Sequence, residues 1–171
     1  MANPAFMSIQ GVTQGNITAG AGTEDSVGNL AISDHPDESR IIQIDHSVIV
    51  PFEPSSGTAS GQRVHQPFRV HKIRDKATAL LKNALTYNEV LEEVVISHYR
   101  QSAVGKLEKF YVTTLKQAQI VEMTSVLANV IDETVDHLPE YDIVGITYAT
   151  ISEEHVVAST TYEDSYREVG V

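Results

Sequence analysis

The sequence predicts a mainly β protein, a small β-barrel that carries one flanking α-helix and long extended loops. Three observations support this fold class. Several segments alternate apolar and polar residues with a period of two, one segment repeats its apolar residues with a helical period, and glycine, serine, asparagine and aspartate gather between the periodic segments. Several strands with one inserted helix are typical of a small barrel or a sandwich. Because 171 residues is an ordinary length for one domain, we expect residues 1–171 to form a single domain.

The N-terminal region predicts one short strand and a long glycine-rich segment. Residues 6–12 alternate weakly and favour a strand. Residues 13–39 follow, and their repeated glycines permit backbone conformations that other residues avoid. Structureless segments of this length are uncommon in compact domains. We therefore expect the segment to contain a strand or to be ordered by a partner.

A clearer strand follows, and a long loop separates it from the next extended segment. Residues 40–50 alternate strictly and are rich in β-branched side chains, and Pro51 ends the strand. Residues 52–62 are a loop of small residues. Residues 63–74 resume extended structure, in which Pro67 indicates an edge position or a bulge. One face of the first strand is formed by Ile42, Ile44, His46, Val48 and Val50.

The predicted helix covers residues 75–88. Its apolar residues recur at the spacing that places them on one face of a helix. Asp75 precedes this face and is a residue type that caps helix N-termini. The apolar stripe consists of Ala77, Leu80, Leu81, Ala84 and Leu85.

The second half of the chain predicts three further strands. Residues 90–101 and 107–124 are strands joined by a turn. Residues 127–140 are a loop or a helical turn. Residues 141–157 form a last long strand, and a polar, tyrosine-bearing C-terminal tail begins at about residue 158.

Composition excludes several classes of function. The formal net charge is −11 and the isoelectric point is near 4.9, which disfavours binding to nucleic acid or to an anionic membrane. The chain has no cysteine, so disulfides, thiol catalysis and cysteine-based metal sites are excluded. The first ten residues lack the basic and apolar regions of a signal peptide, so we expect a protein made in the cytoplasm.

No catalytic, metal or cofactor motif is complete. Gly57 and Gly61 have three residues between them, where a phosphate-binding loop has four, and the lysine of that loop is missing. The seven histidines have no metal-ligand spacing, and we interpret His46 and His98 as packed strand residues. No Gly-x-Ser-x-Gly turn is present. We therefore predict no enzyme activity and no cofactor.

Three blocks of sequence together resemble one family. The first runs from Pro4 to Gly20 and on to Asp25-Ser-Val-Gly-Asn29. The second is Asp45-His-Ser-Val-Ile-Val-Pro51, then Ser56-Gly57 and Gly61-Gln-Arg-Val-His-Gln-Pro67. The third is Lys72-Ile-Arg-Asp-Lys76 leading into Leu80-Leu81. The blocks resemble Hcp, the haemolysin-coregulated tube protein of the bacterial type VI secretion system.

This resemblance implies a structural role and a set of partners. Hcp proteins are β-barrels with a flanking helix that assemble as hexameric rings. The rings stack into an inner tube that a contractile sheath expels, with a spike protein at the tip and small effectors carried in the lumen. The resemblance thus implies cytoplasmic synthesis and export by the type VI machinery without a signal peptide.

The resemblance also implies a contact role for the long loop, which in the family reaches toward neighbouring subunits and rings. A monomeric β-barrel that binds a small ligand is the alternative, and a hydrolase that uses histidine and aspartate is a third reading, without a supporting motif. The residues expected to mediate subunit contacts and ring stacking are Glu53, Pro54, Ser55, Ser56, Gly57, Thr58, Ala59, Ser60, Gly61 and Gln62.

Overall fold

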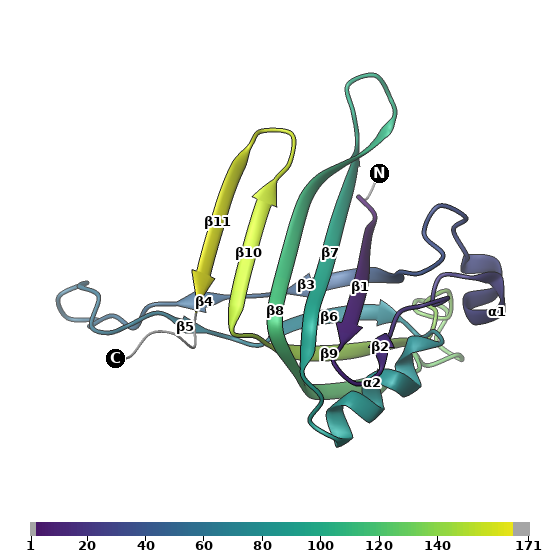
Figure 1. Ribbon diagram of the computed structural model, residues 1–171, viewed down its shortest axis with the longest axis horizontal. Coiled ribbons are helices and arrows are strands. Elements are labelled where there is room, and N and C mark those ends of the chain that lie inside the picture. Colours follow the sequence, from purple (N-terminus) through teal and green to yellow (C-terminus); the bar gives the residue numbers. More distant parts are fainter. Residues whose placement is uncertain (1–2, 166–171) are drawn as a thin grey trace.

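Strands follow one another along most of the computed structural model, which describes residues 3–165 (Figure 1). No helix within that range is long and apolar enough to cross a membrane. The elements are β1 (Ala5–Gly11), β2 (Gly15–Asn16), α1 (Glu24–Val27), the 3-10 helix η1 (Gly28–Leu30), β3 (Ser39–Asp45), β4 (Val48–Ile49), β5 (Val64–His65), β6 (Phe68–Ile73), α2 (Ala77–Thr86), β7 (Leu91–Gln101), β8 (Leu107–Val126), β9 (Tyr141–Thr147), β10 (Thr150–His155) and β11 (Thr160–Ser165).

The main sheet closes on itself, which confirms the predicted barrel. Antiparallel pairing runs in the order β8, β7, β1, β3, β6 and β9, and β9 pairs back with β8. Alternate side chains of these strands point into the closed sheet and form one apolar cluster. Fully buried members of this cluster are Met7, Val70, Val94, Ile96, Leu115, Val144 and Ile146.

Strand β8 pairs with two different strands, β10 and β9, along the same edge, and Gln117 lies between the two pairings. Residues 111–116 pair with β10, whereas residues 119–126 pair with β9. Gln117 lies between the two halves with a φ of 47°, a left-handed conformation that non-glycine residues rarely adopt. This corner lets β10 and β11 continue the sheet beyond the barrel as an outer hairpin (Figure 1).

The prediction of one strand over residues 141–157 is wrong because of this corner. The chain leaves β9 at Thr147 and enters β10 at Thr150, and the two strands pair with opposite halves of β8. Residues 160–165 of the predicted tail form β11, which pairs with β10. The rest of the tail lies outside the described residues.

The strand predicted over residues 40–50 is also shorter than expected. β3 ends at Asp45, where its pairing with β6 reaches Arg69. His46 lies in the break that follows, so it is not inside a strand as expected. Pro67 occupies the break between β5 and β6, which agrees with the irregularity predicted there.

Helix α2 confirms the predicted helix and its apolar stripe. Leu81 is fully buried together with Ala77 and Ala84, and Leu80 and Leu85 pack against the same core. Asp75 caps the N-terminus, because its Oδ1 accepts a hydrogen bond from the backbone N–H of Ala77 at 2.9 Å.

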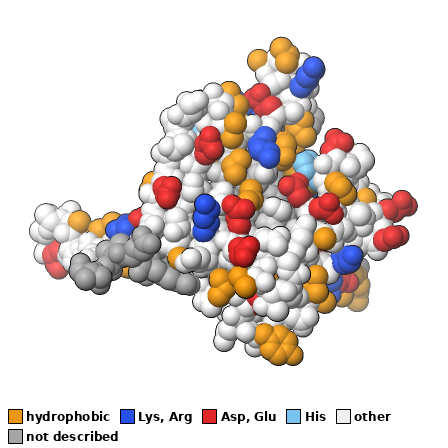
Figure 2. All heavy atoms as spheres, viewed as in Figure 1, with side chains coloured by type: hydrophobic (Ala, Val, Ile, Leu, Met, Phe, Trp, Pro, Cys, Tyr) orange, Lys and Arg blue, Asp and Glu red, His pale blue; other side chains and the backbone are white. Residues whose placement is uncertain are grey.

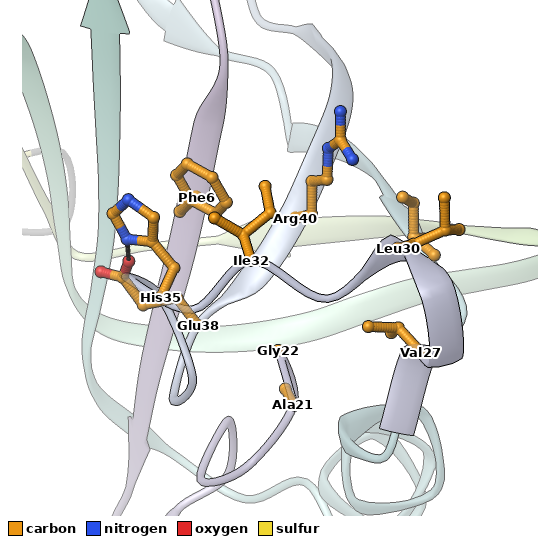
Figure 3. A pocket seen from close by; sticks show the side chains of 10 residues that line it. Phe6, Ala21, Gly22, Val27, Leu30, Ile32, His35, Glu38 and Arg40 are labelled. Atoms are coloured by element: carbon orange, nitrogen blue, oxygen red, sulfur yellow. Dashed lines mark hydrogen bonds and ion pairs between the residues drawn. The ribbon is translucent and has the colours of Figure 1, made fainter. Parts of the chain in front are cut away.

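The glycine-rich segment folds against the outside of β1. It contains β2, which pairs with β1, so one short strand lies in the segment as expected. The His35 ring stacks on Phe6 at 3.8 Å between ring centroids, and Nδ1 of His35 lies 2.5 Å from Glu38 Oε2. Figure 3 shows these side chains around a cavity of about 10 Å³, room for roughly one water molecule. A cavity this small is a packing feature.

Candidate contact hairpin

Residues 48–65 form a hairpin, here called the contact hairpin, that extends away from the barrel (Figure 1). β4 pairs with β5 at its base, and a single bridge joins Phe52 to Ala59 further out. Every residue from 47 to 62 is exposed. The hairpin therefore presents both of its faces to the surroundings of the monomer.

The residues predicted to make contacts, 53–62, occupy the tip of this hairpin. The tip has a defined turn, because the N–H of Glu53 donates to the carbonyl of Thr58 and the N–H of Gly57 donates to the carbonyl of Glu53, both at 2.8 Å. Gly57 adopts a φ of 67°, which glycine allows without steric cost. The structure thus brings the predicted residues together on one projection, and their contact role stays a prediction.

The stem of the contact hairpin is apolar and uncovered. Phe52 is 64% exposed and Ile49 is 50% exposed. Figure 2 shows hydrophobic side chains along this projection. Clustered apolar surface on a projecting element marks an interaction site in a soluble protein. The other exposed apolar residues of the stem are Val48, Val50 and Val64.

A chain of hydrogen bonds, here called the base network, ties the hairpin to the rest of the molecule. Arg63 donates two hydrogen bonds to the carboxylate of Asp164 on β11. His65 Nε2 lies 2.7 Å from Asp164 Oδ2, and its Nδ1 lies 2.7 Å from the hydroxyl of Tyr148. The same hydroxyl lies 2.7 Å from Nε2 of His46. Five side chains from four separate segments thus meet at the hairpin base.

The Asp164 carboxylate gives the base network a permanent negative charge at neutral pH. Hydrogen bonds from Arg63, together with a smaller effect of His65, lower the pKa of Asp164 to about 2 against the opposing effect of burial. Burial lowers the pKa of His46, an effect that the charge of Glu153 opposes and the charge of His65 reinforces. Asp164 is therefore ionised at neutral pH.

The charge of Glu153, on β10 of the outer hairpin, acts on His46 of the base network. Glu153 accepts a hydrogen bond of 2.9 Å from the hydroxyl of Tyr111. Burial and this bond raise the pKa of Tyr111 to about 12, so the phenol stays protonated. His98 packs beside Tyr111 at 5.7 Å between ring centroids, which agrees with its interpretation as a packed strand residue.

The base network was not predicted from the sequence. Arg63 and His65 follow the predicted loop directly, but their partners Tyr148 and Asp164 are more than eighty residues away. Residues 160–165 are polar except for Tyr162, so no alternation indicated the strand that brings Asp164 into the sheet. Within residues 3–165 no group of three or more candidate ligands could hold a metal ion.

A second buried polar cluster lies where β6 meets α2. The Lys72 ammonium is fully buried and lies 2.8 Å from Asp75 Oδ1 and 3.7 Å from Asp142 Oδ2. Asp142 also accepts hydrogen bonds from Thr78 at 2.6 Å and Ser125 at 2.8 Å. Burial alone would raise the pKa of Asp142, but these hydrogen bonds and the Lys72 charge lower it. The cluster joins the helix to the barrel.

Comparison with known proteins gives consistent results. The model of the family described as "Type VI secretion system effector, Hcp" matches residues 6–155. A major exported protein of Pseudomonas aeruginosa is 44% identical over 167 residues, which cover 98% of this chain and 97% of that protein. A crystal structure of an Hcp protein has a TM-score of 0.93 with 38% identity, covering 98% of this chain and 99% of the other. A secreted Hcp protein from Pseudomonas aeruginosa has a TM-score of 0.83 with 40% identity, covering 98% and 100%.

Proposed function

Because the chain belongs to the Hcp family of the type VI secretion system, we propose that it forms hexameric rings that stack into the inner tube of that machinery. In this proposal the protein is a structural component and not an enzyme. The contractile sheath expels the tube, a spike protein sits at its tip, and small effectors travel in its lumen. The protein leaves the cytoplasm through the machinery, and the name of a relative, a major exported protein, supports export.

The contact hairpin is the observation that carries the proposal. Its apolar stem gains free energy when a partner covers it, at roughly 25 cal/mol for each Å² of apolar surface removed from water. Within the described residues the monomer leaves this stem exposed. A hairpin that docks on a different surface of the next copy makes a head-to-tail contact, the kind that generates rings and stacked assemblies.

The free edge of the outer hairpin supports the same conclusion. Among the described residues, β11 pairs with β10 and with no other strand. Uncovered strand edges promote uncontrolled aggregation, and closed assembly is one way in which proteins cover them.

The packed interior of the barrel disfavours the alternative of a monomeric ligand-binding module. A barrel that holds a small ligand keeps a cavity between its strands. Here the inward side chains of the strands are fully buried against one another in a single cluster, as for Met7, Val94 and Ile146. The barrel therefore serves as a solid support for its projections.

Light scattering on the purified protein tests ring formation. Six copies of 18.7 kDa give about 112 kDa for a closed ring. A protein that remains at 18.7 kDa at micromolar concentration would overturn the proposal. Negative-stain micrographs of the same sample then show whether rings stack.

Salt dependence tests how the rings stack. Each ring of six copies with a charge of −11 carries −66, so stacking works against repulsion between like charges. Salt screens exposed charges beyond ~8 Å at physiological ionic strength. We expect stacks that form reversibly and lengthen as salt rises, and tubes that persist unchanged at very low salt would contradict this.

A shortened hairpin tip separates stacking from folding. Removing Ser55–Ser60 deletes exposed residues whose hydrogen bonds stay within the contact hairpin. Loop length has a small effect on folding free energy, so the variant should keep its unfolding temperature and its rings but lose stacking. Loss of the folded monomer would show that the tip is part of the fold instead.

A further inference from the structure

We propose that Asp164 and His65 are positioning residues that latch the contact hairpin to β11 and fix the direction in which it leaves the barrel. The latch is the base network described above. Its importance for assembly rests on the proposed function, but its existence can be tested in the monomer alone.

The location of the hydrogen bonds supports the latch. The hydrogen bonds of the tip, such as Glu53 to Thr58, join hairpin residues to one another and leave the orientation of the hairpin free. At the base, Arg63 and His65 bond to residues of other elements. Figure 1 shows the end of β11 reaching the base of the β4–β5 pair. The direction of the whole projection is therefore set where these side chains meet β11.

The ionised Asp164 determines which group donates and which accepts in every hydrogen bond from His65 to His46. His65 Nε2 must carry the proton that it donates to this carboxylate. In a neutral imidazole the Nδ1 of His65 is then an acceptor, so the hydroxyl of Tyr148 donates to it. The Tyr148 oxygen in turn accepts from Nε2 of His46. All four groups are satisfied while both histidines are neutral.

Protonation of both histidines breaks this arrangement. One added proton on His65 is tolerated, because the Tyr148 hydroxyl can turn and donate to His46 instead. With both rings charged, His46 and His65 both donate to the one Tyr148 oxygen, and the hydroxyl must turn its own proton away from both rings. Two adjacent positive charges also repel each other.

Charged groups surround the two histidines. Asp164 from β11 bonds to His65, and Arg63 from the hairpin and Tyr162 from β11 bond to the same carboxylate. The charge of Glu153 from β10 acts on His46. Burial lowers the pKa of His46 from 6.5. A lowered histidine pKa means that the neutral form stabilises the native state, and this stabilisation is lost as pH falls below 6.5. The latch should thus hold at neutral pH and loosen in mild acid.

Hydrogen exchange across residues 46–66, corrected for the intrinsic effect of pH, measures the opening of the latch. The amide of Gln66 is a direct reporter, since it donates to the carbonyl of Ser47 at 3.0 Å at the hairpin base. We expect Asp164→Asn to raise the open population about tenfold at neutral pH, as when a charged hydrogen bond is lost. Glu163→Gln is the matched control, because Glu163 is exposed and neighbours Asp164 on the same strand.

His46→Gln gives a second test that keeps the neutral network. A glutamine amide can donate to Tyr148 as the imidazole does but gains no charge in acid. Exchange in the unchanged protein should increase as pH falls below 6.5, and this step should be absent in His46→Gln. A step of equal size in the variant would overturn the latch even if Asp164→Asn fails to fold.

Light scattering on the same samples separates this inference from the proposed function. If exchange responds as expected but the protein is monomeric throughout, the latch stands and the tube proposal fails. If rings form but Asp164→Asn and Glu163→Gln exchange at the same rate at every pH, the latch is wrong and the tube proposal is untouched.

Discussion

Replacement of Lys72 by methionine should destabilise the fold strongly, since it leaves two buried carboxylates without their shared cation. The Lys72 ammonium donates to Asp75 Oδ1 at 2.8 Å, to the carbonyl of Ile73 at 3.1 Å and to Thr78 at 3.2 Å. Methionine has nearly the same volume, so packing is largely preserved. Breaking a buried ion pair from one side costs about 3–5 kcal/mol.

Asp75 bears most of this loss. Its side chain is 1% exposed, and without Lys72 it keeps the N–H of Ala77 as a hydrogen-bond donor. Asp142 loses less, because Thr78 and Ser125 continue to donate to it. The double variant Lys72→Met with Asp75→Asn removes the stranded charge, and we expect it to be more stable than Lys72→Met alone.

Urea unfolding followed by circular dichroism measures these differences, on samples held as monomers by dilution. Lys116→Met is the matched control, because Lys116 is exposed on β8, and it should change the unfolding free energy by less than about 0.5 kcal/mol. The reasoning would be refuted if Lys72→Met behaved like this control, or if the double variant were the less stable of the two.

Three further substitutions, one of them with a matched control, test other parts of the fold by the same measurement. Leu81→Asp places a charge at a fully buried position and should abolish folding or destabilise by several kcal/mol; a soluble, normally stable variant would contradict the burial. Gly22→Ala makes a methyl group overlap the carbonyl oxygen of His35 and should cost about 1–3 kcal/mol, whereas Gly61→Ala has room and should be neutral. Glu89→Gln removes a charge that accepts three hydrogen bonds and should cost about 1.5–3 kcal/mol at neutral pH. Burial raises the pKa of Glu89, but the hydrogen bonds outweigh this effect and hold the pKa below 4.5. The contribution of Glu89 to stability should therefore disappear as pH falls below 4.5, and a difference between the two proteins that persists there would refute the reasoning.

Local periodicity predicted the elements whose structure depends on neighbouring residues. The stripe of Leu81 and its neighbours predicted α2, and the alternation around Phe110 predicted the long hairpin of β7 and β8. The break at Tyr148 was missed, since alternation continues through residues 141–157 and only the pairing with β8 divides them. The position of a corner depends on where one distant strand stops pairing with β8 and the next begins, and local alternation does not show this.

The candidate site divides in the same way. The tip of the contact hairpin could be located because glycine and serine gather in residues 53–62. Its base could not, since Tyr148 and Asp164 reach His65 only after the sheet has closed and β10 has turned back. Nothing in the sequence around these three residues indicates that they lie together in the fold.

The shared strand β8 has a mechanical consequence. Its 20 residues run without a break in the chain from the projecting β7–β8 turn down into the barrel wall. A push along this strand would load its ladders with β7, β9 and β10 in shear, so that many hydrogen bonds must yield together. Bonds that share a load resist more force than bonds opened one at a time. The corner at Gln117 is the point where that load passes from the outer hairpin to the closed barrel.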